Sequence, residues 1–564
     1  MDVTADRPWV RSYAPGVPAT VAESPESLVD LLNNAAARFG PRVALDFYGA
    51  TTTYTELQGQ VAGAAEALRR LGVGKDDRVA LILPNCPQHI VAFYAALRLG
   101  AIVIEHNPLY TAEELRTQLA DHGAEVVIAW NKVVPLVQEV AGQTSVKTIV
   151  AVDLSRALPR LKQLALRLPI AKARATREAM TSPVAGVLQW EKLVARTPPL
   201  AADYPAPGPD DTALLQYTGG TTGTPKGAVL THRNLRANAA QGRAWMPGLR
   251  DGEETVYAVL PLFHAYGLTL CLTFSVSIGA TLVLFPRFDL EQVLEAIPRR
   301  PVTFLPAVPP IYERLATAAR ERGLDLTSAR FSLSGAMALP PATVELWESV
   351  TGGLLVEGYG MTETSPVALG NPASPERRPG TVGVPFPSTD IRIVDPEDPS
   401  RDREAGEAGE LLLRGPQVFA GYWRRPEETA KTLLPGGWLR TGDVVVMDGD
   451  GFVTVVDRIK ELIITGGFNV YPSEVEDALR RVPGVADAAA VGLPTANGGE
   501  EVVAAVVLAP DATVDPDGIR AASRAYLAGY KVPRRVVVVD DLPRSMIGKV
   551  LRREVRAQLL PDAG

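Results

Sequence analysis

The sequence predicts an α/β protein with a large N-terminal lobe of covered β-sheets, a small β-barrel-like subdomain and a small α+β domain at the C-terminal end. Three observations support this prediction. The chain has 564 residues, which exceeds a single typical hydrophobic core. Short apolar runs alternate with segments of helical periodicity up to about residue 440, and turn-rich strand pairs follow. We therefore divide the chain into residues 1–459 and residues 460–564.

The apolar runs of the large lobe predict parallel sheets. The runs read RVALIL, AEVVIAW, VKTIVAV, TLVLF and GLLVEGYG, and the helical segments between them include Glu56–Leu71 and Pro87–Leu99. Continuous Val, Ile and Leu strands that alternate with helices are typical of parallel sheets covered on both faces. The main lobe is therefore expected to be α/β.

The pattern changes at Pro379–Asp443. Short strands separated by Pro, Gly and Asp clusters predict the barrel-like subdomain in this range. The Asp-Gly pairs of residues 448–451 lie between alternating apolar runs and predict a hairpin.

The C-terminal region predicts a separate α+β domain that begins near Lys460. Ser473 and Glu476 have the spacing of a capping pair that opens an amphipathic helix, and Pro483-Gly484 ends it. Two further apolar runs predict strands after this helix.

Composition and charge restrict the classes of function. Apolar and charged fractions of 46% and 21% are those of a soluble globular protein. A net charge of −7 and a pI near 5.6 argue against general nucleic-acid binding. The N-terminal residues have no apolar stretch behind a basic start, so no secretory signal is expected. Cys86 and Cys271 have no metal-binding or redox spacing, which favours a reducing, cytoplasmic setting.

One long apolar stretch requires a choice between two structures. Val256–Pro286 contains no Asp, Glu, Lys or Arg and is long enough to span a bilayer. Pro261, His264, Gly267 and Gly279 divide it into strand, turn, helix and strand. We therefore expect a buried segment of the α/β core.

Residues 155–180 form an unusual insert. Seven Lys or Arg residues accompany a single Glu178, with leucines between them, in a chain that is acidic overall. A basic amphipathic stretch of this kind can lie on the anionic inner face of a membrane. A solvated helical excursion explains the pattern equally well.

The stretch YTGGTTGTPKGAVLTHRN at residues 217–234 is typical of a phosphate-binding loop. Four glycines allow backbone N–H groups to turn toward an anion, five threonines add donors, and Lys226 supplies a charge. A flexible surface loop is the alternative. A P-loop ATPase does not fit, because Lys226 follows Pro225 and precedes Gly227, so neither the turn nor the magnesium-binding hydroxyl is in place.

This loop and four further motifs, in the same order and spacing, resemble the adenylate-forming acyl-CoA synthetases over about Trp9 to Arg556. The motifs are YTGGTTGTPKG at 217–227, YGMTE at 359–363, RTGD at 440–443, DRIKELI at 457–463 and GK at 548–549. NPLYTAEEL, LPLFHAYG, GFNVYPSEVED and LAGYKVPR look most like bacterial medium- and long-chain fatty-acid:CoA ligases, and the insert resembles theirs. The departures are Ile547 before Gly548 and Met337-Ala338 after Ala336, and neither removes a charged group.

The resemblance implies two half-reactions, in which ATP and a carboxylate give an acyl-adenylate and coenzyme A then displaces AMP. It also implies a Mg²⁺ ion held by Thr218 and Glu363. The implied ATP- and AMP-binding residues are Thr218, Gly219, Gly220, Thr221, Thr222, Gly223, Lys226, Ser334, Gly335, Ala336, Glu357, Gly358, Tyr359, Gly360, Met361, Thr362, Asp443 and Arg458.

The remaining implied residues concern catalysis and domain movement. Lys549 would act in the first half-reaction from a mobile C-terminal domain, with Lys460 as the hinge. Gly466 and Gly467 would line the pantetheine tunnel. His264, implied as catalytic together with Lys549 and Glu363, would stand between the acyl pocket and the thiol channel. Trp245 is a weaker candidate for the acyl tunnel, and a packed core histidine is the alternative for His264.

The resulting hypothesis is a cytoplasmic fatty acyl-CoA synthetase whose partners are a fatty acid, ATP and CoA. A ligase for aryl or other small acids, an acyl-AMP ligase and a non-catalytic nucleotide-binding scaffold are the alternatives. Two further hypotheses are a peripheral membrane contact through residues 155–180 and a homodimer.

Overall fold

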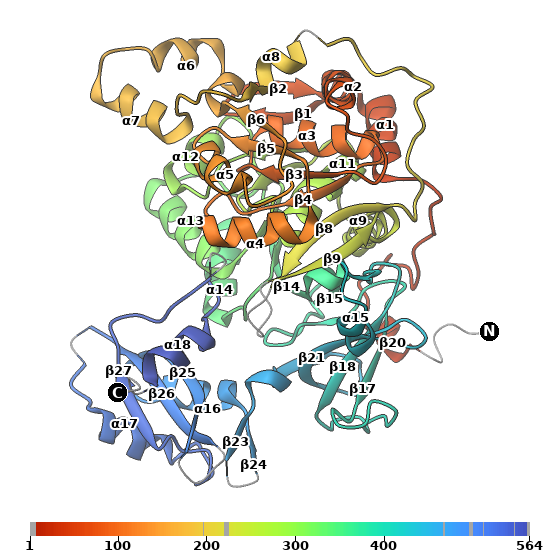
Figure 1. Ribbon diagram of the computed structural model, residues 1–564. Helices are drawn as coiled ribbons and strands as arrows, with labels where there is room; N and C mark the ends of the chain where they lie inside the picture. Colours follow the sequence, from red (N-terminus) through yellow and green to blue (C-terminus); the bar gives the residue numbers. More distant parts are fainter. Residues whose placement is uncertain are drawn as a thin grey trace.

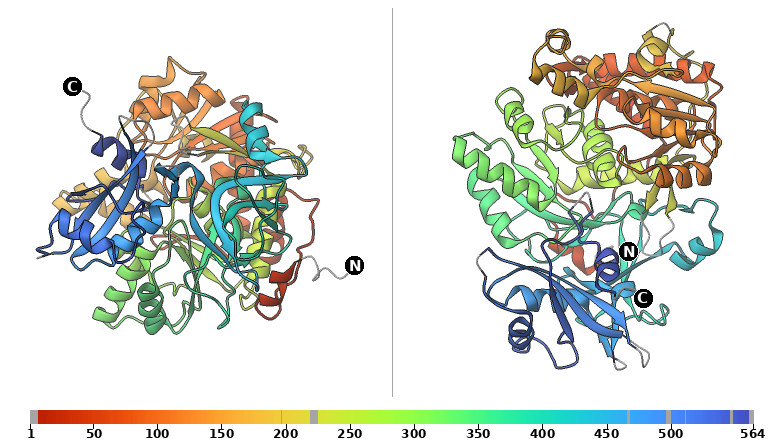
Figure 2. Two further views of the ribbon diagram at one scale, coloured as in Figure 1. Left: turned by 90° about the horizontal axis from the view of Figure 1, so that it is seen from below. Right: turned by 60° about the vertical axis from the view of Figure 1, so that its left-hand side comes forward.

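The computed structural model describes residues 7–195, 197–218, 225–465, 468–495, 500–510, 512–545 and 548–560. Two β-sheets with helices packed on them form the large lobe, and a smaller antiparallel sheet adjoins them (Figure 1). A small domain of its own follows at the C-terminal end, and Figure 2 shows it against the large lobe from two other directions.

The first sheet has eight strands in the order β19-β9-β8-β4-β3-β5-β6-β7. Their bounds are β3 Arg78–Ile82, β4 Ile102–Glu105, β5 Val126–Trp130, β6 Thr148–Val152, β7 Leu188–Gln189, β8 Thr212–Thr218, β9 Lys226–Thr231 and β19 Gly421–Tyr422. Strands β3 to β8 pair in parallel. Val79 and Leu81 pack into one apolar core and Ala80 and Ile82 into another, so β3 is covered on both faces. This confirms the parallel, doubly covered sheet.

The second sheet has nine strands in the order β16-β15-β14-β13-β12-β10-β11-β1-β2. Their bounds are β1 Val43–Phe47, β2 Ala50–Thr53, β10 Thr255–Ala258, β11 Thr281–Leu284, β12 Phe304–Ala307, β13 Phe331–Ser334, β14 Leu354–Gly360, β15 Val367–Gly370 and β16 Val384–Pro385. The six strands from β14 to β1 are parallel, and antiparallel strands close each edge.

The helices of the large lobe begin where the sequence provides caps. They include α1 Leu28–Phe39, α2 Tyr54–Arg70, α3 Pro87–Arg98, α4 Ala112–His122, α5 Val134–Ala141, α8 Trp190–Ala195, α9 His232–Trp245, α12 Leu290–Ala296, α13 Pro309–Arg322 and α14 Pro341–Thr351. Thr53 and Glu56 form a reciprocal capping box at α2, and Pro87 opens α3. A cap of this type stabilises a helix by about 1 kcal/mol. The two helices predicted from the sequence are confirmed to within two residues.

The uncharged stretch Val256–Pro286 is buried core. It contains β10, α10 (Ala265–Gly267), η3 (Leu268–Thr273), α11 (Phe274–Ile278) and β11. No helix in the described ranges combines the length and the apolar character needed to cross a bilayer. The nearby Cys271, like Cys86, is buried and forms no disulfide.

The antiparallel region and the C-terminal domain follow the large lobe. The antiparallel sheet contains β17 Asp390–Val394, β18 Gly409–Arg414, β20 Leu433–Leu434, β21 Trp438–Met447 and β22 Val453–Arg458, with α15 Pro426–Thr432 beside it. Strands β21 and β22 form the predicted hairpin. The C-terminal domain contains η5 Ile459–Glu461, β23 Ile463–Thr465, β24 Phe468–Val470, α16 Pro472–Arg480, β25 Val485–Pro494, β26 Glu500–Leu508, α17 Pro516–Ser523, β27 Arg535–Val538 and α18 Arg552–Leu559.

The predicted capping pair at α16 is wrong. Tyr471 occupies the N-cap position without a side-chain cap, and Pro472 opens the helix. Arg552 of α18 donates to Ser473 Oγ at 2.9 Å and to both carboxylate oxygens of Glu476 at 2.7 Å. The two side chains therefore join two helices of the domain instead of capping one.

Candidate active site

The predicted site residues meet where β13 and β14 end. The two strands are parallel neighbours, and Ser334 pairs in register with Glu357. Residues 334–336 lie at and just after the end of β13, and residues 357–362 form the second half of β14 and the turn after it, so two motifs more than twenty residues apart lie side by side. Ligands of open α/β sheets bind at the carboxyl ends of parallel strands. This edge is therefore the expected place for a ligand.

Glycines allow close packing at this edge. A Cβ on Gly335 would lie 3.0 Å from Cζ of Tyr266, whose hydroxyl donates to the Leu333 carbonyl at 2.7 Å. A Cβ on Gly360 would lie 1.8 Å from the carbonyl oxygen of Pro366, which no backbone accommodates without shifting. Ala336 adopts a left-handed φ of 70°, so the turn after β13 is tight.

The Asp443 cluster consists of Tyr359, Asp443 and Arg458. Strands β21 and β22 place Asp443 directly opposite Arg458, and Arg458 Nε lies 2.9 Å from Asp443 Oδ1. The Tyr359 hydroxyl donates to Asp443 Oδ2 at 2.5 Å. Burial, followed by the neighbouring carboxylate, raises the pKa of Tyr359 well above its ordinary value, so the hydroxyl remains a donor. Asp443 is a buried carboxylate with one cationic and one neutral donor.

The Glu363 cluster consists of Lys226, Glu363, Tyr422 and Glu428. Glu363 is buried on η4 (Thr362–Thr364), and its Oε1 accepts a hydrogen bond from the Tyr422 hydroxyl at 2.6 Å. Lys226 Nζ lies 5.2 Å from the Tyr422 ring centroid and forms a short ion pair with Glu428 of α15. Burial raises the pKa of Glu363, and the Tyr422 hydrogen bond offsets only part of this. The carboxylate charge is thus incompletely compensated.

Strands β8 and β9 hold the two ends of the glycine- and threonine-rich loop. Thr218 pairs with Lys226 in register, and its hydroxyl donates to the Lys226 carbonyl at 3.5 Å. The predicted loop residues Gly219, Gly220, Thr221, Thr222 and Gly223 lie outside the described residues. The loop ends within the same region as the Glu363 cluster.

Lys549 approaches this site from the C-terminal domain. A Cβ on Gly548 would lie 3.5 Å from Sδ of Met337, in the turn that follows β13. Burial lowers the pKa of Lys549, Arg458 lowers it further, and Glu461 and Asp443 act in the opposite direction. A lysine of one domain therefore lies within electrostatic range of the Asp443 cluster of the other.

The connection between the domains is short. Strand β22 ends at Arg458 and η5 follows directly, with the backbone of Lys460 inside it. Glu461 of η5 forms a short ion pair with Arg552, which ties the connection to the C-terminal domain. The side chain of Lys460 and both Gly466 and Gly467 lie outside the described part of the chain.

His264 lies next to this region but makes structural contacts. Its Nδ1 accepts a hydrogen bond from the Tyr266 backbone N–H at 3.2 Å and caps α10. Burial lowers its pKa to about 4, so the ring is neutral at pH 7. Trp245 is fully buried, stacks on Phe386 and donates to the Asn371 carbonyl at 3.0 Å. The channel role of His264 and the tunnel role of Trp245 remain predictions.

Sequence reasoning missed Tyr422 and Glu428. Tyr422 lies on β19, which pairs with β9, and Glu428 lies one helical turn into α15. Neither residue belongs to a phosphate-binding pattern, and both reach Lys226 from about two hundred residues away. Only the pairing of β19 with β9 brings them to the loop.

The site lies at the carboxyl ends of parallel strands, pairs a buried carboxylate with Arg and Tyr, and receives a lysine from a second domain. These features are typical of a nucleotide-binding enzyme. Residues 32–423 match the family described as AMP-binding enzyme, and residues 474–549 match the AMP-binding enzyme C-terminal domain. The chain belongs to the AMP-binding enzyme family.

Two relatives match nearly the whole chain. A long-chain-fatty-acid–CoA ligase of Bacillus subtilis (strain 168) is 38% identical over 557 residues, covering 98% of each chain. A feruloyl-CoA synthase of an Amycolatopsis species is 37% identical over 522 residues, covering 92% of this chain and 96% of the relative.

Two solved structures of one enzyme, with and without ATP, match this chain to different extents. ATP-bound MatB from Rhodopseudomonas palustris has a TM-score of 0.81 at 29% identity, and apo MatB has a TM-score of 0.70. Both comparisons cover 94% of this chain and 98% of the other. The present arrangement thus resembles the ATP-bound state more closely than the apo state.

Proposed function

We propose that this protein activates a medium- or long-chain fatty acid with ATP and transfers the acyl group to coenzyme A, releasing AMP and pyrophosphate. Membership of the AMP-binding family and the near full-length similarity to a long-chain-fatty-acid–CoA ligase support this assignment. The structural observation that carries the two-step reaction is the approach of Lys549 to the Asp443 cluster across a short hinge.

In the first half-reaction, a carboxylate oxygen of the acid attacks the α-phosphorus of ATP. A P–O bond to the acyl oxygen forms, and the bond to pyrophosphate breaks. Negative charge builds on the α-phosphate oxygens in the transition state, and the Lys549 ammonium stabilises it without reorganisation. Asp443 accepts hydrogen bonds from the ribose hydroxyls, and residues 218–226 hold the β- and γ-phosphates.

The lowered pKa of Lys549 fits this role. Burial and the neighbouring Arg458 destabilise its charge in the absence of an anion. A phosphate and a carboxylate would remove that penalty by providing opposite charge. The same lysine would therefore be held in the site more strongly while the reactants are present, which suits a domain that must later leave.

Glu363 fits a ligand of Mg²⁺. Its carboxylate is buried, its pKa is raised, and no Lys or Arg of the described ranges forms an ion pair with it. Mg²⁺ is usually bound by one or two protein oxygens together with phosphate and water. Glu363, with the Thr218 hydroxyl, would hold an ion that neutralises charge on the phosphates.

In the second half-reaction, the thiol sulfur of CoA attacks the acyl carbon and AMP leaves with its phosphate oxygen. Lys549 is not needed for this step, so we propose that the C-terminal domain rotates about Lys460 and brings Gly466 and Gly467 to the thiol. His264, neutral at pH 7, would then border the channel without placing a charge beside the acyl chain.

The test is the formation of AMP and pyrophosphate with ATP and Mg²⁺ across acids from acetate through palmitate to coumarate, with and without CoA. Turnover that requires CoA and peaks on medium or long chains is expected. A maximum on coumarate would favour an aryl-acid ligase, which the similarity to a feruloyl-CoA synthase also supports. Adenylate that accumulates regardless of CoA would indicate an acyl-AMP ligase, and no turnover would indicate a scaffold.

A further inference from the structure

Residues 154–180 form a separate structural unit on the large lobe. The unit contains η2 (Leu154–Ala157), α6 (Arg160–Ala165) and α7 (Ala171–Met180), and it projects from the end of the lobe opposite the C-terminal domain (Figure 1). Backbone carbonyls anchor it, since Trp130 Nε1 donates to the Met180 carbonyl at 2.8 Å and Lys132 Nζ to the Glu178 carbonyl at 2.7 Å. The unit is attached to the lobe and is not a free tail.

Two sets of apolar residues in this unit face opposite ways. One set is buried against the lobe and consists of Leu158, Leu166, Ala173 and Met180. The other set is exposed and consists of Leu161 at 81%, Leu164 at 57%, Leu168 at 51% and Ile170 at 53%. Leu161 and Leu164 are three residues apart on α6 and share one face. Four large apolar side chains exposed within ten residues mark an interaction surface.

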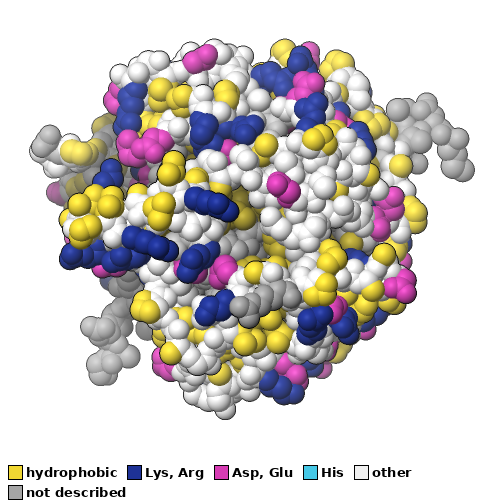
Figure 3. All heavy atoms as spheres, turned by 90° about the horizontal axis from the view of Figure 1, so that it is seen from above, with side chains coloured by type: hydrophobic (Ala, Val, Ile, Leu, Met, Phe, Trp, Pro, Cys, Tyr) yellow, Lys and Arg dark blue, Asp and Glu magenta, His cyan; other side chains and the backbone are white. Residues whose placement is uncertain are grey.

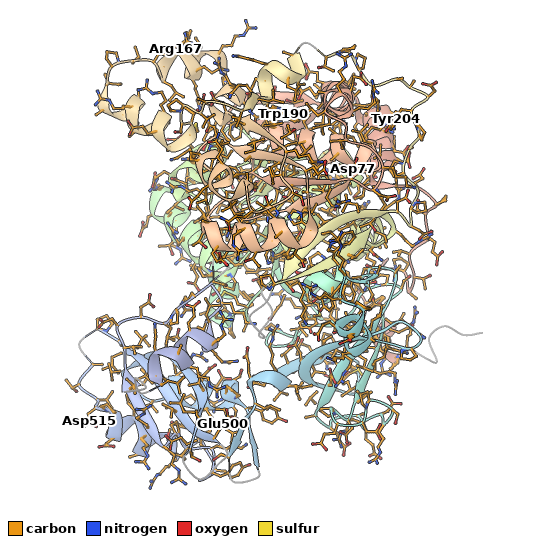
Figure 4. All side chains as sticks on the ribbon, viewed as in Figure 1. Asp77, Arg167, Trp190, Tyr204, Glu500 and Asp515 are labelled. Atoms are coloured by element: carbon orange, nitrogen blue, oxygen red, sulfur yellow. The ribbon has the colours of Figure 1, made fainter. Side chains whose placement is uncertain are left out.

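Basic side chains surround the exposed apolar set. The exposed basic residues are Arg156, Arg160, Lys162, Arg167, Lys172, Arg174 and Arg177. Within the described residues, Arg156 forms an ion pair with Asp153 at 3.5 Å, and no other member of this set pairs with a carboxylate. Figure 3 shows dark blue and yellow side chains side by side over this unit, and Figure 4 places Arg167 at the outer margin of the molecule.

The charge of the unit is opposite to that of the whole chain. Residues 155–180 contain seven basic residues and one Glu178, a net charge of +6, whereas the chain carries −7. An apolar protein partner would cover the leucines but would leave the unpaired cations without counter-charges. An anionic bilayer satisfies both, because leucines enter the acyl boundary while Lys and Arg remain at the headgroup phosphates.

We propose that residues 156–177, referred to as the basic-apolar surface, dock on an anionic lipid bilayer. Docking at this end of the large lobe would leave the C-terminal domain on the far side of the molecule (Figure 1). Each cation near an anionic membrane strengthens binding about fivefold at moderate salt. The proposal concerns binding alone, so it stands or falls independently of which acid the enzyme activates.

The first test is cosedimentation of the full chain with phosphatidylcholine vesicles and with vesicles containing 40% phosphatidylglycerol. Binding to the anionic vesicles is expected, with a loss of at least tenfold between about 0.05 and 0.5 M salt. Equal binding to both vesicles, or none to either, would overturn the proposal.

The second test changes the apolar set. The variant that replaces Leu161, Leu164, Leu168 and Ile170 by Ser should lose at least tenfold in affinity for anionic vesicles. Leu109→Ser is the matched control, because Leu109 is 70% exposed and lies outside the surface. Unchanged turnover of hexanoate by both variants would show that they fold. Equal vesicle binding by the fourfold variant and the control would overturn the proposal.

The third test separates a bilayer from a second copy of the chain. Replacing Arg160, Arg167, Lys172 and Arg174 by Gln should weaken vesicle binding more than a hundredfold at low salt, and Arg401→Gln should not. Sedimentation velocity without lipid should give the same molecular mass for all variants. A dimer that dissociates when the leucines are replaced would show that the surface binds another copy, and would overturn the bilayer proposal.

Discussion

The two buried carboxylates of the site, Asp443 and Glu363, differ in how their charge is balanced. Each accepts a hydrogen bond from a tyrosine hydroxyl: Asp443 from Tyr359 at 2.5 Å, and Glu363 from Tyr422 at 2.6 Å. Asp443 also has Arg458 at 2.9 Å. No cation of the described residues pairs with Glu363, and burial raises its pKa. Within the described residues, an ion pair therefore balances the charge of Asp443 but not that of Glu363.

This difference indicates which part of the site is preformed. The register of β21 and β22 holds Asp443, the carboxylate proposed to bind ribose, and ribose binding there would require only the release of Tyr359. On the side proposed to bind phosphate, Glu428 pairs with the ammonium of Lys226. Under the proposed function, ATP with a metal ion would complete the Glu363 cluster, whereas it would enter an existing Asp443 cluster.

The largest expected effect comes from the cation that the second domain adds to the Asp443 cluster. Lys549→Ala should lower adenylate formation about 1000-fold, because a preorganised stabiliser of transition-state charge is removed. Thioester formation from supplied acyl-adenylate should stay within threefold. Pyrophosphate release and single-turnover thioester formation measure the two steps.

The matched control for Lys549 is Lys531→Ala. Lys531 lies in the same domain but pairs with Glu474 at 2.6 Å. The rate of adenylate formation by Lys531→Ala should remain near that of the unmodified enzyme. If Lys549→Ala lowered the rates of adenylate formation and thioester formation equally, the proposal that Lys549 acts only in the first half-reaction would be wrong.

The second-largest effect is expected from a change in the Asp443 cluster itself. Asp443→Asn keeps the shape but removes the charge, leaves Arg458 without its partner and weakens both ribose contacts. We expect kcat/KM for ATP to fall about 100-fold, since breaking a buried charged hydrogen-bonded pair costs about 2–5 kcal/mol. Asp448→Asn, in the turn of the same hairpin, should change kcat/KM less than twofold. Comparable losses in both variants would indicate a general disturbance of the hairpin.

The strands that carry much of the Asp443 cluster could be predicted from the sequence, because they follow local rules of strand and turn formation. The run GLLVEGYG predicted a strand of a parallel sheet, which β14 confirms, and the ends of parallel neighbours such as β13 and β14 meet at one edge. The Asp-Gly turn predicted the β21–β22 hairpin, which sets Asp443 opposite Arg458. Pattern and turn chemistry predicted these elements, and the resemblance to the adenylate-forming acyl-CoA synthetases supplied the choice of Tyr359, Asp443 and Arg458.

The Glu363 cluster and the contacts inside the C-terminal domain could not be predicted in the same way. Ser473 and Glu476 have the spacing of a cap, yet Arg552, 76 residues beyond Glu476, binds both. Tyr422 reaches Glu363 only through the pairing of β19 with β9. In both cases the contact is made by a guanidinium or hydroxyl group that is distant in the sequence. No local sequence pattern predicts such a contact.

A smaller effect is expected in the pH dependence of kcat/KM, which should respond differently to changes beside Glu363 and beside Asp443. Tyr422→Phe removes the hydrogen bond that lowers the pKa of Glu363, so that pKa should rise further above its ordinary value. In its proposed role as a metal ligand, Glu363 would have to be ionised, so the acid limb of the kcat/KM profile should move to higher pH by about half a unit to one unit. Tyr359→Phe should leave the limb in place, because Arg458 still balances Asp443. Equal shifts in the two variants would remove the distinction between the clusters.

The smallest effect concerns the ion pair that holds Lys226. The hydrogen bond from Lys226 lowers the pKa of Glu428 to about 2, so Glu428 is ionised at neutral pH and competes with phosphate for the ammonium. Glu428→Gln should therefore lower the KM for ATP two- to fivefold, the range expected when a partly exposed ion pair is released. Glu427→Gln, on the exposed side of the same helix, is the control and should have no effect. A rise in KM would mean that Glu428 aims Lys226 at the phosphates instead of withholding it, and the Glu363 cluster would then be preformed like its counterpart.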